Sequence, residues 1–244
     1  MPSRRCGLRR VITLLCLAAM PARWCAASAT GLNTIPTTDI APSRSWISQF
    51  QNGNVSFRSP SLFNSPNLLF QNQFGVNSRI EAGADWIQPP DLDHRAVTLN
   101  FKMLVATEDE VRPNAAFGIS NIANRQMPSY YITFSKTLNF DEQQQERFRA
   151  HHRRNRKLLG RRIHGGLIFD GRRTFQPFVG TDIQLSESAV FQADWINGSG
   201  NAVSFGASYI CSDQRTVINP AFLYSNDTKR VDGFFLNFSH QFNL

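Results

Sequence analysis

The chain has 244 residues, a formal net charge of +8 and four cysteines. Five of its 26 basic residues, none of its acidic residues and three of its cysteines lie in the first 29 residues, which the sequence predicts to be a cleaved signal peptide. The mature chain then carries a charge of about +3 and one cysteine, Cys211. This excludes an intrachain disulfide framework and removes the basic balance as an argument for nucleic-acid binding.

The signal peptide is recognised by its three parts. Four arginines precede an apolar run at 11–22 that is too short to span a bilayer, and Ala27-Ser28-Ala29 forms a small-x-small cleavage site. Ser3–Arg9 also resembles a twin-arginine export motif, so Sec and twin-arginine export both stay open. Residues 30–45 are rich in Thr, Pro and Ser, and we expect them to form an extended periplasmic lead-in.

Short runs of alternating apolar and polar residues follow from 46 to 244. In 96–105, for example, Val97, Leu99 and Phe101 alternate with Thr98 and Asn100, which is the period of a β-strand. Twelve such runs occur, at 46–57 with a bulge near Asn52-Gly53, 67–76, 79–87, 96–105, 114–120, 129–140, 162–170, 174–185, 188–196, 202–211, 216–224 and 233–244. With no helical period between them, they predict an all-β fold.

The two faces of these strands favour a transmembrane, antiparallel, up-and-down barrel of about twelve strands, within a range of ten to fourteen. The polar face is small and largely uncharged, and glycines recur on it, as in the lumen of a membrane barrel. If the first strand rises from the periplasm, Trp86 and Trp195 lie at the outer interface, and Trp46, Phe140 and Phe242 lie at the inner one. The short segments 75–79, 185–188 and 211–215 then become periplasmic turns.

Two other classes of protein stay open on this pattern. A soluble periplasmic or secreted binding module would pack the same apolar faces into a core. An outer-membrane lipase would need a Ser and a His on the lipid face near the outer rim, where neither His164 nor His240 is expected. The sequence offers no nucleophile motif, so we predict no catalytic residues and no cofactor.

Six charged residues are predicted on the lumen face of the strands. They either form a salt-bridged filling of a narrow barrel or line a pore and set its selectivity, and the sequence leaves both open. These lumen candidates are Arg79, Glu81, Asp85, Lys102, Asp170 and Asp194.

A basic insertion at 141–162 interrupts the strands with eight basic and three acidic residues. By the same parity it lies in the periplasm, where it would bind an anionic glycan or a periplasmic partner, or would be a solvated segment. Its anion-binding candidates are Arg147, Arg149, Arg153, Arg154, Arg156 and Lys157. His151-His152 has no further ligand at metal-binding spacing, so no metal site is predicted.

The last strand alternates apolar residues up to the final residue. It resembles the C-terminal assembly signal of outer-membrane barrels, although it ends in Leu244 instead of an aromatic residue. The signal residues are Gly233, Phe234, Leu236, Phe238, Phe242 and Leu244. The expected partners are therefore the lipid bilayer of the outer membrane and the outer-membrane assembly machinery.

Two stretches carry a resemblance to a known family. Asn33–Pro42 (NTIPTTDIAP) and Phe74–Trp86 (FGVNSRIEAGADW) resemble the YjbH-like outer-membrane β-barrels of Gram-negative bacteria. Members of that family often open with a similar Ile-Pro-Thr-rich segment and carry a Gly-x-x-(Asp/Ser)-Arg-Φ-Glu element. The resemblance implies an outer-membrane location and a role in exopolysaccharide production and export, and it brings no catalytic residues.

Overall fold

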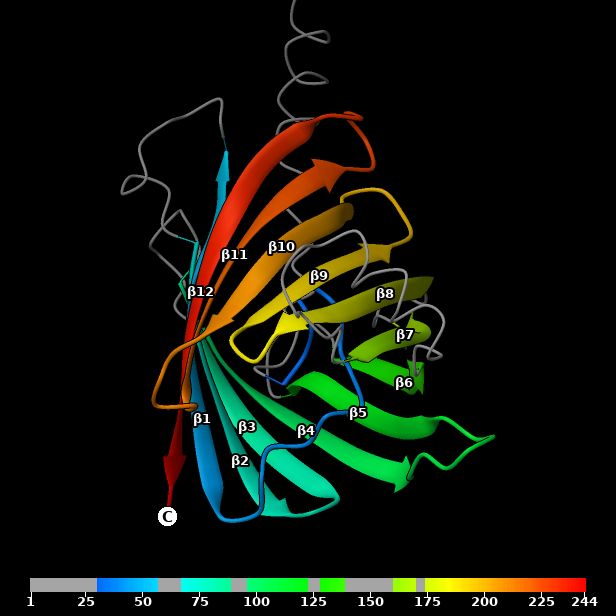
Figure 1. The fold of residues 1–244 in the computed structure, drawn as a ribbon. Helices are drawn as coiled ribbons and strands as arrows, with labels where there is room; N and C mark the ends of the chain where they lie inside the picture. The colour runs from blue at the N-terminus through cyan, green and yellow to red at the C-terminus, as the bar shows by residue number, and fades with distance from the viewer. Residues whose placement is uncertain (1–29, 57–66, 89–95, 123–127, 139–159, 170–173) are drawn as a thin grey trace, which may run out of the picture.

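The computed structural model describes residues 30–56, 67–88, 96–122, 128–138, 160–169 and 174–244. They form a closed antiparallel barrel in which every strand pairs with its neighbours in sequence and β1 pairs with β12 (Figure 1). The strands are β1 (Ser45–Ser56), β2 (Asn67–Asn77), β3 (Ile80–Gln88), β4 (Ala96–Ala106), β5 (Asn114–Ile122), β6 (Ser129–Leu138), β7 (Gly160–Phe169), β8 (Phe175–Ser186), β9 (Ala189–Ile196), β10 (Ala202–Ile210), β11 (Thr216–Ser225) and β12 (Val231–Asn243). The predicted barrel of about twelve strands is confirmed.

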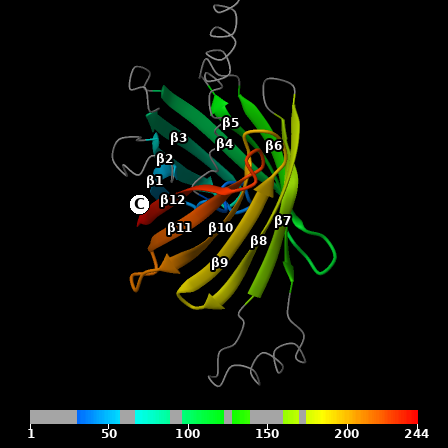
Figure 2. The same ribbon diagram turned by 90° about the horizontal axis from the view of Figure 1, so that it is seen from above.

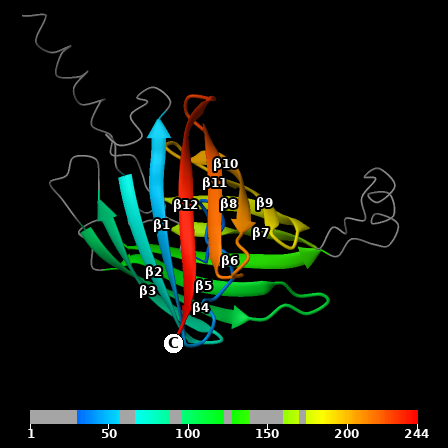
Figure 3. The same cartoon turned by 60° about the vertical axis from the view of Figure 1, so that its left-hand side comes forward.

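The barrel is closed by its first and last strands. β1 and β12 pair antiparallel from Ser45 opposite Asn243 to Ser56 opposite Gly233, side by side in Figure 3. The register shifts between Asn52 and Val55, so the bulge predicted near Asn52-Gly53 is confirmed. Among the described strands, closure leaves no unpaired sheet edge, and the apolar β12 is paired on both sides.

The barrel has two ends, of which we call the one where β1 begins and β12 ends the terminal end. Three short connections lie there: Ser78–Arg79, Glu187–Ser188 and 211–215. Asp213 fixes the last of these by accepting hydrogen bonds from Thr216 Oγ1 at 2.5 Å and from the backbone N–H groups of Arg215 and Thr216. These hydrogen bonds lower the pKa of the Asp213 carboxyl to about 2.

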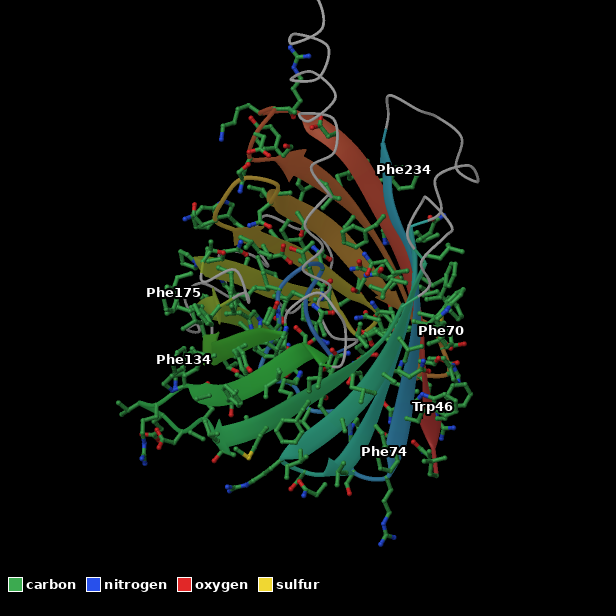
Figure 4. All side chains as sticks on the ribbon, turned by 180° about the vertical axis from the view of Figure 1, so that it is seen from behind. Trp46, Phe70, Phe74, Phe134, Phe175 and Phe234 are labelled. Carbon is green, nitrogen blue, oxygen red and sulfur yellow. The ribbon has the colours of Figure 1, made fainter. Side chains whose placement is uncertain are left out.

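The side chains of the barrel are arranged inside out. Outward positions carry large apolar residues that remain exposed, such as Phe238 at 46%, whereas the inward Lys102 is only 1% exposed. Polar groups that do face outward pair with each other: Trp46 Nε1 and Ser48 Oγ both donate to Asn72 Oδ1 at 3.0 Å. Figure 4 shows outward aromatic side chains at Trp46, Phe70, Phe74, Phe134, Phe175 and Phe234.

Two aromatic residues meet at the terminal end, as the sequence predicts. The rings of Trp46 and Phe242 lie 5.4 Å apart, and Trp86 and Trp195 lie nearer the opposite ends of β3 and β9. Phe140, predicted for the same inner girdle, lies outside the described residues. Among the residues that the structure describes, no helix is long and apolar enough to cross a membrane.

The predicted basic insertion ends earlier than expected. β7 begins at Gly160, so Arg161 and Arg162 belong to the barrel wall and not to the insertion. β-sheet alternation turns Arg162 inward, opposite Asp182 of β8, and this pairing accounts for the difference. The rest of the insertion, 141–159, lies outside the described residues.

Candidate functional site

The lumen of the barrel is occupied by the chain's own residues 30–44, which we call the lumen segment. This segment precedes β1 and crosses the inside of the barrel (blue in Figures 1 and 2). The sequence predicts an extended periplasmic lead-in here, whereas in the structure the apolar and hydrogen-bonding groups of the segment contact the inner wall. Leu32 and Ile35 are buried in one cluster with Tyr131, Ile168, Phe178 and Ile196 of the wall.

The first anchor of the lumen segment is a carboxylate near the terminal end. Glu81 of β3 forms a buried salt bridge with Lys102 of β4, with Nζ and Oε1 3.0 Å apart. The same carboxylate accepts hydrogen bonds from Thr30 Oγ1 at 2.8 Å and from the backbone N–H of Ala41 at 2.7 Å. Lys102 also contacts Thr30 Oγ1. Glu81 therefore ties both ends of the segment to the wall.

The second anchor lies further up the barrel, on β9. Asp194 accepts the backbone N–H of Thr34 at 2.9 Å and the Thr34 hydroxyl at 2.5 Å, while Ser204 of β10 donates to the same carboxylate at 2.6 Å. The neighbouring Asn33 accepts from Asn219 Nδ2 of β11 at 3.1 Å. These contacts carry the segment across the lumen from β3 and β4 to β9 and β11.

The third anchor is an ion-pair relay on β7 and β8. Arg162 holds the Asp39 carboxylate of the lumen segment with two hydrogen bonds, Nη1 to Oδ1 at 2.6 Å and Nη2 to Oδ2 at 2.9 Å. The opposite side of the guanidinium binds Asp182 at 2.7 Å. A bidentate arginine–carboxylate pair is a strong and directional contact, so Asp39 fixes the returning part of the segment.

A row of three hydrogen-bonded side chains lies beside this relay. Ser135 Oγ is 2.7 Å from His164 Nδ1, and His164 Nε2 is 3.2 Å from Asp182 Oδ2. These are the residue types of a Ser–His–Asp hydrolase triad. Here Ser135 also accepts the backbone N–H of Thr38 at 3.3 Å, and Asp182 is ion-paired with Arg162. The row thus takes part in holding the lumen segment.

Glycines of the wall make room for the segment at two positions. A Cβ atom at Gly75 of β2 would lie 2.0 Å from the carbonyl oxygen of Pro42, and one at Gly180 of β8 would lie 2.6 Å from Ile35 Cδ1. Real Cβ atoms do not approach so closely, so Gly75 requires the absence of a side chain against the Pro42 backbone, and at Gly180 the Ile35 side chain would have to shift. Wall and segment are therefore complementary in shape as well as in hydrogen bonding.

The predicted lumen residues separate into three groups. Glu81, Lys102, Asp85 and Asp194 are all buried inside the barrel, and the first two form a pair. Arg79 lies exposed in the β2–β3 turn, because the strand begins one residue later than its predicted start. Asp170 lies outside the described residues.

The other predicted sites are placed as follows. The six anion-binding candidates all fall in 139–159, outside the described residues. The predicted assembly-signal residues lie on β12, except for Leu244, which follows its last residue, and Leu236, Phe238 and Phe242 are exposed on the outer face. Among the described residues, no group of three His, Cys, Asp or Glu side chains is arranged to hold a metal ion.

Sequence reasoning missed the relay of Asp39, Arg162 and Asp182. In the sequence, Arg162 falls in the predicted basic insertion and Asp39 in the predicted lead-in. Parity could have found Asp182, because it alternates with Ile183 on β8 and so faces the lumen. No local signal links Asp39 to Arg162, which is 123 residues away.

No protein-family model and no curated protein matches the chain. Among solved structures, the barrel is similar to a KdgM porin (8% identity, TM-score 0.48, 82% of this chain and 99% of that chain). It is also similar to the outer membrane protein Omp33 of Acinetobacter baumannii (8%, 0.48, 84% and 99%) and to a triple mutant of the Rhodopseudomonas blastica porin (8%, 0.38, 73% and 57%). The likeness is one of general barrel architecture.

Proposed function

We propose that this protein spans the outer membrane as a pore-class β-barrel whose lumen is closed by residues 30–44. The observation that carries the proposal is the inside-out arrangement of the wall. Large apolar side chains cover the outer face, and charged and amide side chains such as Lys102, Glu81 and Gln71 are buried inside. In lipid this arrangement places apolar groups against acyl chains and satisfies the polar groups within the protein.

The soluble binding module is less well supported by the same observation. A soluble protein rarely exposes a continuous apolar surface, whereas aromatic and aliphatic side chains here remain exposed around the outer wall. The charged outward side chains of β6 and β7, Lys136 and Arg161, lie near the ends of their strands, where long side chains reach the membrane surface. Contact with acyl chains is therefore more favourable for this outer face than contact with water.

A second candidate is the passage of a carbohydrate polymer, as the YjbH-like resemblance implies. It is supported by uncharged hydrogen-bonding groups inside the barrel, among them Gln49 with Gln71 and Ser208 with Gln192. Amides and hydroxyls are suited to the hydroxyl groups of a sugar. Such a solute requires an open lumen, so this candidate depends on release of the lumen segment.

Two charge-neutral variants test the closed pore, because they act on one contact from opposite sides. Gly180→Val places a side chain where Ile35 lies, and Ile35→Asn puts an amide into the apolar cluster. Both are expected to raise the channel-open probability at least about tenfold over the wild-type protein in planar bilayers. Gly165→Val is the control, because a Cβ there meets only Phe178 O, at 3.6 Å.

Two results would reject the proposal. Recovery of the mature protein in the soluble periplasmic fraction without detergent would contradict the membrane location. If both opening variants insert and fold like the wild type but never conduct, the barrel is structural and is not a pore.

A further inference from the structure

The inner wall carries more negative than positive charge in the part that the structure describes. Its inward-facing acidic residues outnumber its basic ones by four to two. The acids are Glu81, Asp85, Asp182 and Asp194, and the bases are Lys102 and Arg162. The wall therefore has a formal charge of about −2 with neutral histidine.

Each of the two basic residues of the wall forms a salt bridge with a neighbouring carboxylate of the wall. Lys102 lies 3.0 Å from Glu81, and Arg162 lies 2.7 Å from Asp182, so each pair is close to neutral. Both pairs are near the terminal end, since Glu81 and Arg162 are among the first three residues of β3 and β7. This leaves Asp85 and Asp194, further along their strands, as the uncompensated charges of the wall.

The described partners of these two carboxylates are uncharged. Asp85 accepts from Gln71 Nε2 at 3.2 Å, and its Oδ1 atom has no hydrogen-bond partner among the described residues although it is buried. Asp194 is satisfied by Ser204 and by two donors of Thr34. When the lumen segment leaves, Asp194 loses both donors of Thr34. An open lumen would then hold two carboxylates that lack a cationic partner.

We infer that the pathway closed by the lumen segment selects cationic solutes, and that Asp85 and Asp194 determine this selectivity. The inference rests on the proposed pore. Fixed carboxylates in a confined lumen raise the local concentration of cations and repel anions, as rings of acidic residues do in cation channels. The segment itself supports this chemistry, because it presents N–H and O–H donors to Asp194 in the closed state.

The basic insertion connects β6 to β7 in the sequence, and its charge has the opposite sign to that of the wall. Its residues 141–159, without Arg161 and Arg162 of the wall, carry six basic and three acidic side chains, and this sequence charge of about +3 would repel cations at low ionic strength. The screening length falls from about 10 Å in 0.1 M salt to about 3 Å in 1 M salt. Charges that a solute does not contact are then screened more completely than carboxylates that it passes at contact distance, so 1 M salt isolates the contribution of the wall.

Reversal potentials of the Ile35→Asn channel across a KCl gradient with 1 M on one side test the inference. The expected potassium-to-chloride permeability ratio is at least about 3, and Asp85→Asn with Asp194→Asn should bring it close to 1. Glu187→Gln, which removes one carboxylate charge from the exposed β8–β9 turn and so matches each single Asp→Asn change, should leave it unchanged. Folding of each variant is checked by its heat-modifiable migration on gels.

The outcomes separate the two proposals. A conducting channel whose potassium-to-chloride permeability ratio is 1 or below, or whose ratio the two Asp→Asn changes do not alter, contradicts the proposed cation selectivity. The proposed pore is not affected by that result. Folded Ile35→Asn and Gly180→Val proteins that never conduct overturn the pore, and the selectivity with it.

Discussion

At the scale of single residues, the lumen is organised around charges that are buried with their partners. Glu81 contacts Lys102, Thr30 and Ala41 at the same time. Arg162 likewise binds both Asp39 and Asp182. A buried ion pair adds little net stability compared with apolar packing, but removal of one partner leaves an uncompensated charge. We therefore regard these residues as determinants of where the lumen segment lies.

The Glu81–Lys102 pair gives a residue-scale prediction. Glu81→Gln should lower the free energy of unfolding by about 3–5 kcal/mol, because Lys102 stays buried without its carboxylate. Glu81→Gln with Lys102→Met should cost clearly less than the sum of the two single changes. Urea titration in lipid vesicles measures the free energy of unfolding of the wild type, the two single variants and the double variant. Strict additivity would show that the two charges do not interact.

At the scale of elements, the lumen segment is held without any regular secondary structure. It is anchored by β3, β7 and β9, each through side chains that face the lumen. Three anchors on different parts of the wall restrict the segment far more than one would, because each anchor shortens the chain that can still move. Release therefore requires several contacts to break together.

Accessibility of a cysteine in the segment tests its place in the lumen. Thr37 is fully buried, so Thr37→Cys in a Cys211→Ser background should react with a bulky maleimide at least about 100 times more slowly than Ser199→Cys in an exposed loop. Adding Ile35→Asn should accelerate the reaction at position 37 and leave that at position 199 unchanged. Equal rates at the two positions in the parent protein would place the segment outside the barrel.

The terminal strand gives a second element-scale prediction. Residues 238–243 supply six of the ten residue pairs of the β1–β12 ladder, so deletion of 238–244 should abolish assembly into the membrane. Deletion of Leu244 alone removes one backbone hydrogen bond, to Arg44 O at 3.0 Å, and should be tolerated. Membrane fractionation and heat-modifiable migration on gels measure the assembly of both truncated proteins. Normal insertion of the long truncation would contradict a role for β12 in closure.

At the scale of the whole molecule, the sequence predicts the wall better than its contents. The wall follows from a period of two: Val179 faces out and Gly180 faces in because neighbouring side chains alternate. The lumen segment has no period, and its contacts with Asp194 and Arg162 span 160 and 123 residues. Such contacts depend on the closed barrel, so the local pattern of Thr and Pro could only indicate an extended chain.

The bilayer itself can be tested with two positions on one strand. Val179 lies near the middle of β8 and Leu185 near its end, with similar exposures of 47% and 43%. In a membrane, Val179→Arg should cost about 2–4 kcal/mol of unfolding free energy and Leu185→Arg about 0–1 kcal/mol, because the cost of an arginine depends on its depth.

In water the same two substitutions should change the free energy of unfolding by nearly equal amounts, since both side chains are about half exposed and neither forms part of a buried core. Urea unfolding of the two variants in lipid vesicles therefore separates a lipid-facing wall from a solvated one. A difference of about 2 kcal/mol or more between them supports the membrane barrel. Equal and small effects at both positions would mean that the outer face of β8 does not lie against acyl chains.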